Sequence, residues 1–283
     1  MEKYILTISC PDRVGIVAAV SGFLAAQDGF IFESHQFGDP STEIFFMRIE
    51  FAPGERTPSM DTFKENFQPV VKQFEMNWEL HRTNYRPKVL IMVSQQGHCL
   101  NTLLNKKAMG DLQMEIPAIV SNHADLEKMA KWYETPFYHF PVTPSAKPEQ
   151  ESKVLQLIDD LKIDLVVLAR YMQILTGSFV NRMQGRIINI HHSFLPSFKG
   201  AKPYHQAYSR GVKLIGATSH YVSEHLDEGA IIEQEVTRVD HTYPPEELVA
   251  IGQDIESLAL AKAVKWHIQQ RVFLNGEKTV VFR

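Results

Sequence analysis

The alternation of short apolar runs with amphipathic stretches after Pro87 is the feature that most constrains the fold of this chain. The runs 89–93 (VLIMV) and 165–168 (LVVL) are wholly apolar, which is typical of strands buried on both faces of a parallel sheet. Helical patterns between such runs supply the crossovers that parallel strands need. The sequence therefore predicts an α/β domain with a doubly wound, mostly parallel sheet. Further strands are expected near 116–120, 137–140 and 186–188, and helices near 125–133 and 149–161.

Residues 4–80 follow a different pattern of strand, helix, two strands, helix and strand. Asp12 is the expected N-cap of the first helix, and Gly29 follows its end. The expected apolar stripe of that helix is Val14, Val17, Val20, Phe23 and Leu24. The βαββαβ order predicts a small ferredoxin-like domain. Periodicity is lost at 84–87, so we expect domains at 1–83 and 88–283 joined by a linker at 84–87.

Composition excludes several classes of function. The 283 residues carry a net charge of −4 with a pI near 6.3, so a nucleic-acid partner is not expected. The first residues do not resemble a signal peptide and no apolar stretch is long enough to span a bilayer, so the expected location is cytoplasmic, with no membrane partner. Cys10 and Cys99 fall in different expected domains and are expected to be reduced.

Two polar side chains follow the apolar start of the strand near 186–188. Asn189 and His191 lie two positions apart and therefore point to the same side of a strand. Ligands bind beyond the carboxyl ends of parallel strands, and an amide beside an imidazole can stabilise an oxyanion that forms from a carbonyl group. An isolated pair of this kind is more often a capped strand end, so its importance depends on its context.

That context includes Leu195-Pro196-x-Phe198-x-Gly200 directly downstream, and Asp227 in a loop shortly before Gly229. Together these residues resemble the folate-dependent formyltransferase family. The resemblance implies that Asn189, His191 and Asp227 are catalytic. It also implies a folate substrate and no metal or redox cofactor. The segment after the run 165–168 matches the family's folate-binding segment, which implies substrate contacts by Arg170, Tyr171, Met172, Ile174 and Leu175, with Gln173 departing from the basic residue often found there.

The segment 10–17 (CPDRVGIV) resembles the ACT regulatory domain. That resemblance implies a homo-oligomer and an amino-acid effector near Asp12 and Gly15. Gly15 has an equally good explanation in close helix–strand packing, since glycine serves both needs.

The formyl acceptor separates the members of the family. The turn 94–100 (SQQGHCL) holds one glycine and is a poor phosphate nest, so a glycinamide ribonucleotide acceptor is not expected. A tRNA acceptor is not expected for this acidic chain. Water remains. The ACT module, His98 in place of a phosphate loop, and the segment 200–208 are similar to the formyltetrahydrofolate deformylases. This implies hydrolysis of 10-formyltetrahydrofolate to formate and tetrahydrofolate in one-carbon metabolism and purine biosynthesis, with His98 at the substrate.

Several alternatives accompany this prediction. The chain can be a formyltransferase to a small amine, or a folate-binding regulatory protein without turnover. A metal-dependent hydrolase is suggested by the histidines that gather beside Asp227, namely His191, His192, His205, His220 and His225. Their spacing does not match a known zinc motif, and adjacent histidines on a strand face opposite ways, which disfavours a metal site. Ser193 lacks the flanking glycines of a nucleophile elbow.

Overall fold

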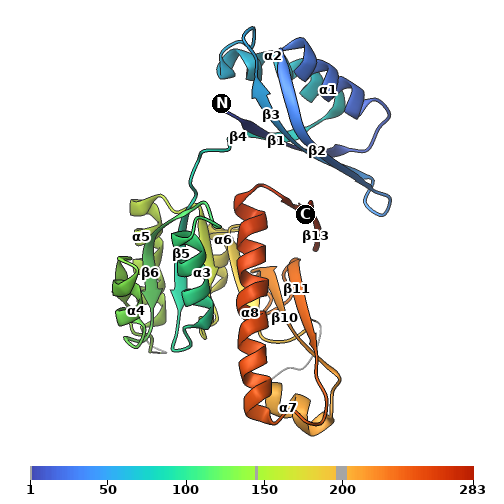
Figure 1. Cartoon of the computed structure of the whole chain (residues 1–283). Coiled ribbons are helices and arrows are strands. Elements are labelled where there is room, and N and C mark those ends of the chain that lie inside the picture. Colours follow the sequence, from blue (N-terminus) through green and yellow to red (C-terminus); the bar gives the residue numbers. More distant parts are fainter. Residues whose placement is uncertain (1, 144–145, 196–202) are drawn as a thin grey trace. The chain divides into compact units, whose positions relative to one another are not determined.

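The chain forms two compact units (Figure 1), and the computed structural model describes residues 2–143, 146–195 and 203–283. The first unit comprises the residues up to Tyr85 together with the C-terminal segments Gln269–Asn275 and Thr279–Arg283. The second comprises Arg86–Ile268 and Gly276–Lys278. The C-terminal tail thus differs from the expectation that all residues from 88 onward belong to one domain.

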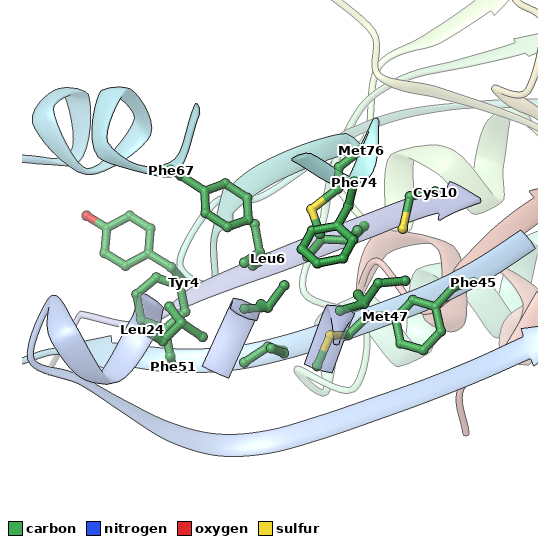
Figure 2. Close-up of a cluster of buried hydrophobic side chains, with 14 of the residues drawn as sticks. Tyr4, Leu6, Cys10, Leu24, Phe45, Met47, Phe51, Phe67, Phe74 and Met76 are labelled. Carbon is green, nitrogen blue, oxygen red and sulfur yellow. The ribbon is translucent and has the colours of Figure 1, made fainter. Parts of the chain in front are cut away.

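The first unit is a four-stranded sheet covered on one face by two helices (Figure 1). Its sheet order is β2-β3-β1-β4 with antiparallel neighbours, and its element order is the one that the sequence predicts. Figure 2 shows the core, where Leu6, Met47 and Phe51 from the strands meet Leu24 and Phe67 from the helices. The elements are β1 (Tyr4–Pro11), α1 (Ile16–Ala26), β2 (Gly29–Asp39), β3 (Ile44–Pro53), α2 (Met60–Phe74) and β4 (Asn77–Arg82).

Helix α1 begins later than expected. Its N-cap is Gly15, which has a φ of 100°, and the expected capping role of Asp12 is wrong. A left-handed residue turns the chain sharply into the helix, and glycine adopts this conformation without steric cost. The later start leaves Val14 outside the helix and fully exposed, and Val17 partly exposed. The buried stripe consists of Ile16, Val20 and Leu24.

The C-terminal tail forms a hairpin of β12 (Val272–Asn275) and β13 (Lys278–Val281). Phe273 packs its ring 5.8 Å from that of Phe46, edge to face, and Phe282 packs 5.4 Å from Phe273. Phe46 is thereby almost completely buried. Strands of four residues give too short a periodic pattern to be recognised in the sequence, which is why this hairpin was not expected.

The same tail completes a buried charge cluster around Arg48, which is 2% exposed. The Arg48 guanidinium donates to Glu33 Oε2 at 2.6 Å and to the carbonyl of Gln269 at 3.1 Å. Arg271 donates to both carboxylate oxygens of Glu33, at 3.0 and 3.1 Å. A buried cation needs paired and hydrogen-bonded surroundings, and here one of its partners comes from the opposite end of the chain.

The second unit contains a seven-stranded sheet of order β11-β10-β9-β8-β5-β6-β7. Strands β5 to β9 pair in parallel, whereas β10 runs antiparallel to β9 and β11. This confirms the predicted mostly parallel sheet. The strands are β5 (Lys88–Val93), β6 (Glu115–Ser121), β7 (Phe137–His139), β8 (Leu165–Leu168), β9 (Ile187–His191), β10 (Leu214–Tyr221) and β11 (Ile231–Arg238).

Helices cover this sheet on both faces, as the apolar strands require. Side chains of α5 and α6 pack on β5, β6 and β8 in one core. Helices α3 and α8 contact one another, and α8 also contacts β9, β10 and β11. The helices are α3 (His98–Ala108), α4 (Glu127–Trp132), α5 (Lys147–Leu161), α6 (Gly177–Arg182), α7 (Pro203–Arg210) and α8 (Pro245–Ile268). Within the described ranges, none has the length and apolar character needed to cross a bilayer.

The cluster around Arg48 predicts a specific pH dependence of stability. Burial alone would raise the pKa of Glu33, but hydrogen bonds from His35 and Arg271 and the charges of Arg271 and Arg48 hold it at about 2. A depressed carboxyl pKa stabilises the folded state above the ordinary pKa near 4.5, and this contribution is lost as the pH falls toward 2. We therefore expect Glu33→Gln to lower the free energy of unfolding by about 1.5–3 kcal/mol at pH 7, the range for hydrogen bonds to charged groups.

Urea unfolding followed by circular dichroism between pH 7 and pH 3 measures this difference. The deficit should shrink as the pH falls below about 4.5. Glu65→Gln is the matched control, because Glu65 is an exposed glutamate on α2 of the same unit. A deficit in Glu33→Gln that does not depend on pH, or one equal to that of Glu65→Gln, would contradict the prediction.

Candidate active site

A pocket of about 280 Å³ opens beyond the carboxyl ends of β8 and β9, where parallel sheets bind their ligands. Met172, Ile174 and Leu226 expose about 60% of their surface there, so the pocket has an apolar border. Its lining consists of residues 168, 170–175, 180, 189–192, 220 and 222–227. It therefore brings together the polar end of β9, the loop after β8 and the loop that carries Asp227.

Asn189 and His191 lie on β9, and the register of the sheet gives Asn189 a partner. Asn189 is directly opposite His220 of β10 in the antiparallel ladder, so the two side chains share a face. His220 is 2% exposed, and its Nδ1 lies 2.9 Å from the carbonyl oxygen of Tyr221. A carbonyl only accepts, so Nδ1 carries the proton and Nε2 accepts from Asn189 Nδ2 at 3.2 Å. The second N–H of the Asn189 amide stays available to the pocket.

Asp227 is held in an unusual backbone conformation in the loop between β10 and β11. Its φ is 58°, a left-handed value that costs a non-glycine residue of order 1–3 kcal/mol. Nearby, a Cβ on Gly229 would lie 1.6 Å from the carbonyl oxygen of Tyr221, so only glycine fits that position. The loop places Asp227 Oδ2 3.3 Å from His191 Nδ1 and Oδ1 3.7 Å from His220 Nε2. The structure thus brings Asn189, His191 and Asp227 together.

The electrostatics of Asp227 differ from those of a typical buried base. The hydrogen bond from His191 lowers the pKa of Asp227 and outweighs partial burial, and the positive charge of His191 lowers it further. His191 Nε2 is buried and has no hydrogen-bond partner among the described residues. One edge of the imidazole is thus fixed by Asp227, and the other is free to act on a ligand.

The loop after β8 is anchored from two sides. Ser94, at the end of β5, accepts a hydrogen bond from the backbone N–H of Met172 at 3.0 Å. Glu151 of α5 accepts from the backbone N–H of Thr176 at 3.0 Å. Arg170 begins the loop with a φ of 64°. Arg170 and Asp227 thus both line the pocket and both have left-handed backbone conformations, which are common at functional sites.

The substrate-binding residues expected from the sequence occupy different positions. Arg170, Met172, Ile174 and Leu175 line the pocket, and so does Gln173. Tyr171 also contributes to the lining, but its side chain is buried and its hydroxyl accepts from Gln150 at 3.2 Å.

His98 lies away from this lining, at the first residue of α3. Its Nε2 donates to Glu256 Oε2 at 2.8 Å, and Glu256 is 2% exposed on α8. Tyr204 donates to Glu256 Oε1 at 2.8 Å, and Arg170 Nε lies 3.4 Å from Oε2. Burial would raise the pKa of Glu256, but these three partners hold it below its ordinary range. His98 therefore belongs to a buried cluster behind Arg170.

His98, Cys99 and Glu256 bring potential metal-ligand atoms within 4.8 Å of one another, in the part of the chain that the structure describes. Burial raises the pKa of the Cys99 thiol, which keeps it protonated, and the Glu256 carboxylate is already occupied by a histidine, a tyrosine and an arginine. A thiol and a guanidinium at this position oppose a divalent cation. The histidine-rich segment near Asp227 supplies no such group within the described residues.

The expected effector residues lie in the first unit. Gly15 caps α1 without a side-chain hydrogen bond, and no acidic residue occupies the first turn of this helix. The backbone N–H of Asp12 donates to the carbonyl of Glu43 at 2.8 Å. A cavity of about 350 Å³ in this unit is lined by Tyr4, Met60, Asp61, Lys64, Leu80 and Arg82, and includes neither effector candidate. The motif residues Pro196 to Gly200 lie outside the described residues.

Three residues of the site were not expected from the sequence. The sequence suggests His192 and His220 only as metal ligands and suggests no role for Glu256. The position of His220 follows from the pairing of β9 with β10, which no local pattern reveals. Glu256 occupies one buried position on a 24-residue helix, where a single carboxylate facing the sheet is the only sequence signal.

Comparisons with known proteins agree with this geometry. A family model described as formyl transferase matches residues 87–264. A formyltetrahydrofolate deformylase from Corynebacterium sp. (strain P-1) is 48% identical over 281 residues, which cover 99% of this chain and 98% of the relative. The crystal structure of a formyltetrahydrofolate deformylase from Burkholderia mallei is 49% identical in sequence and superposes with a TM-score of 0.95. The match covers 100% of this chain and 100% of that protein.

Glycinamide ribonucleotide transformylase 1 from Symbiobacterium toebii is more distant. It is 26% identical with a TM-score of 0.65, and the match covers 72% of this chain and 98% of that protein. The two deformylases match over nearly the whole of this chain, whereas the transformylase matches 72% of it. The chain belongs to the formyltetrahydrofolate deformylase family of formyl transferases.

Proposed function

We propose that this protein hydrolyses 10-formyltetrahydrofolate to formate and tetrahydrofolate, with water as the formyl acceptor. The observation that carries this proposal is the convergence of Asn189, His191 and Asp227 at one pocket in a chain that matches deformylases over its whole length. The role of each residue follows from its hydrogen bonds.

In the first step, the oxygen of a water molecule attacks the formyl carbon, and the carbonyl electrons move onto oxygen. The free N–H of Asn189 and the free edge of His191 stabilise this oxyanion, since preorganised donors act strongly where charge develops. Asp227 positions the water and takes its proton. With a lowered pKa it is a weak base, so its main contribution is orientation and the stabilisation of a protonated His191.

In the second step, the tetrahedral intermediate collapses. The bond between the formyl carbon and N10 breaks, and N10 gains the proton that the Asp227–His191 pair received from water. Formic acid ionises to formate. Every proton is supplied by water and returned to a product, so the reaction as written needs no metal or redox cofactor.

The pocket suits one end of a folate. Its volume of about 280 Å³ lies near the lower limit of small-molecule sites, which suits a ring system such as the pterin better than the whole substrate. Met172, Ile174 and Leu175 supply apolar surface for the ring, with Arg170 and Tyr171 completing the loop. We retain these as substrate-binding residues. His98 is not retained in this role, because it pairs with Glu256 behind Arg170.

We propose further that the first unit is an ACT module that forms a homo-oligomer and binds an amino-acid effector near Asp12 and Gly15. The order of its strands supports this assignment, as does the start of α1 at Gly15, where no side chain caps the helix. A role in one-carbon metabolism and purine biosynthesis, and a cytoplasmic location, are proposed with it.

The function is tested by measuring formate release from 10-formyltetrahydrofolate, with and without amino acids, and with glycinamide ribonucleotide as a competing acceptor. We expect free formate to be the main product. The turn before α3 has Gly97 as its one glycine, and His98 behind it is committed to Glu256, so no phosphate nest is available. Formylated nucleotide that accumulates faster than formate would make the protein a transferase.

Asp227→Asn should slow hydrolysis by about a hundred- to ten-thousand-fold while folate binding is largely retained, because the amide keeps the shape but can neither take a proton nor stabilise a protonated His191. Steady-state kinetics and equilibrium binding of tetrahydrofolate measure the two effects. Glu228→Gln, an exposed neighbour in the same loop, is the control and should be nearly neutral. Turnover above about a tenth of normal in Asp227→Asn would show that the proposed mechanism is wrong.

The homo-oligomer should form through β2, one of the two edge strands of the first sheet. Phe30, Phe32 and Phe37 are exposed on this strand, and an exposed apolar edge is a template for pairing with a second copy. Light scattering at micromolar concentration should give a dimer or a larger species, and Phe30→Glu should shift it toward monomer. Trp132→Glu, at an exposed residue of the other unit, should not. A wild-type monomer would contradict this prediction.

A further inference from the structure

His192 follows His191, lines the same pocket and is held by Arg170. The two imidazole rings stack with centroids 4.9 Å apart and planes inclined by 20°. The carboxylate of Asp227 contacts the ring of His191, and the guanidinium of Arg170 contacts the ring of His192. The two neighbouring rings therefore face opposite charges.

The contact with Arg170 fixes the tautomer of His192. Arg170 Nη1 lies 2.8 Å from His192 Nδ1. A guanidinium has only donors, so His192 Nδ1 must be the acceptor and carry no proton. The ring is then neutral, and its one N–H is at Nε2. Within the described residues Nε2 has no hydrogen-bond partner, and His192 lines the pocket.

Arg170 is itself held in place. Its Nε donates to Gln96 Oε1 at 3.0 Å and lies 3.4 Å from Glu256 Oε2. Glu256 is in turn held by His98 and Tyr204, each at 2.8 Å. An arginine that is fixed at one edge by a buried carboxylate can direct its other edge at a single acceptor.

The charged and titratable groups around His192 keep it neutral. Burial lowers the pKa of His192 to about 4, and the charges of Arg170 and His191 act in the same direction, against the weaker effects of Glu256 and Asp227. An imidazole that stays neutral at working pH can donate one hydrogen bond without adding a second positive charge beside His191.

We propose that His192 is a further catalytic residue, whose Nε2–H donates to the formyl oxygen as that oxygen becomes an oxyanion, with Arg170 and Glu256 as positioning residues. Asn189, His191 and His192 all line this pocket. This inference rests on the proposed hydrolysis of a formyl group.

Two substitutions of His192 test the roles of its two ring nitrogens separately. In His192→Gln, the side-chain amide N–H reaches the position of Nε2. In His192→Asn, the shorter side chain keeps an acceptor for Arg170 at the position of Nδ1 but has no donor at Nε2. We expect His192→Asn to lower kcat by about a hundred- to a thousandfold with little change in KM, as for one oxyanion donor. His192→Gln should remain within about tenfold of the wild type.

Two results would overturn the proposal. Full turnover in His192→Asn would show that no donor is needed at this position. Equal losses in both variants would show that the ring acts only by packing. Circular dichroism of both variants establishes whether they fold like the wild type.

Nitrogen-15 NMR of the histidine rings tests the tautomer independently of catalysis. We expect His192 to show the neutral Nε2–H form with no titration between pH 5 and 8, and to lose that fixed form in Arg170→Met. Titration within this range in the wild type would overturn the proposal. An absence of formate release from the wild type, with the His192 signal as expected, would instead show that the proposed hydrolysis is wrong.

Discussion

The hydrogen bonds of His220 are the constraint on which the rest of the site depends. One nitrogen donates to a backbone carbonyl, and the other accepts from Asn189, so a ring with almost no exposure to solvent has both polar atoms satisfied. This orients the Asn189 amide without any contact from a ligand. The same carbonyl, that of Tyr221, approaches Gly229 so closely that the loop carrying Asp227 is set by backbone packing. The buried imidazole of His220 therefore lies between the amide of Asn189 and the carboxylate of Asp227 and contacts both.

Two carboxylates perform different tasks because their partners differ. Asp227 is partly exposed and faces histidines at the pocket, whereas Glu256 is buried and faces a histidine, a tyrosine and an arginine. Both have lowered pKa values and are anionic at neutral pH. Asp227 lines the pocket, where a ligand can reach it, while Glu256 lies 3.4 Å from Arg170 Nε and holds that guanidinium in place.

Much of the fold could be predicted from the sequence, because apolar strands and amphipathic helices have distinct periods. Asn189 and His191 stand out in the sequence because they lie at the end of the buried strand β9, and Asp227 stands out through the resemblance to the formyltransferase family. Asp12 was misjudged as a cap, because the left-handed Gly15 delays the helix in a way that composition does not show. His220 and Glu256 needed long-range pairing to be found, since each acts through a residue far away in the chain. Local patterns do not contain such information.

The C-terminal hairpin joins the first unit after the chain has passed through the whole second unit. The N-terminal unit is therefore discontinuous in the gene. A fragment that ends at Tyr85 leaves Arg48 without the carbonyl of Gln269 and Phe46 without the ring of Phe273. A fusion or recombination event that moves this unit intact must therefore carry two separate coding segments. The coding sequence of the second unit lies between them.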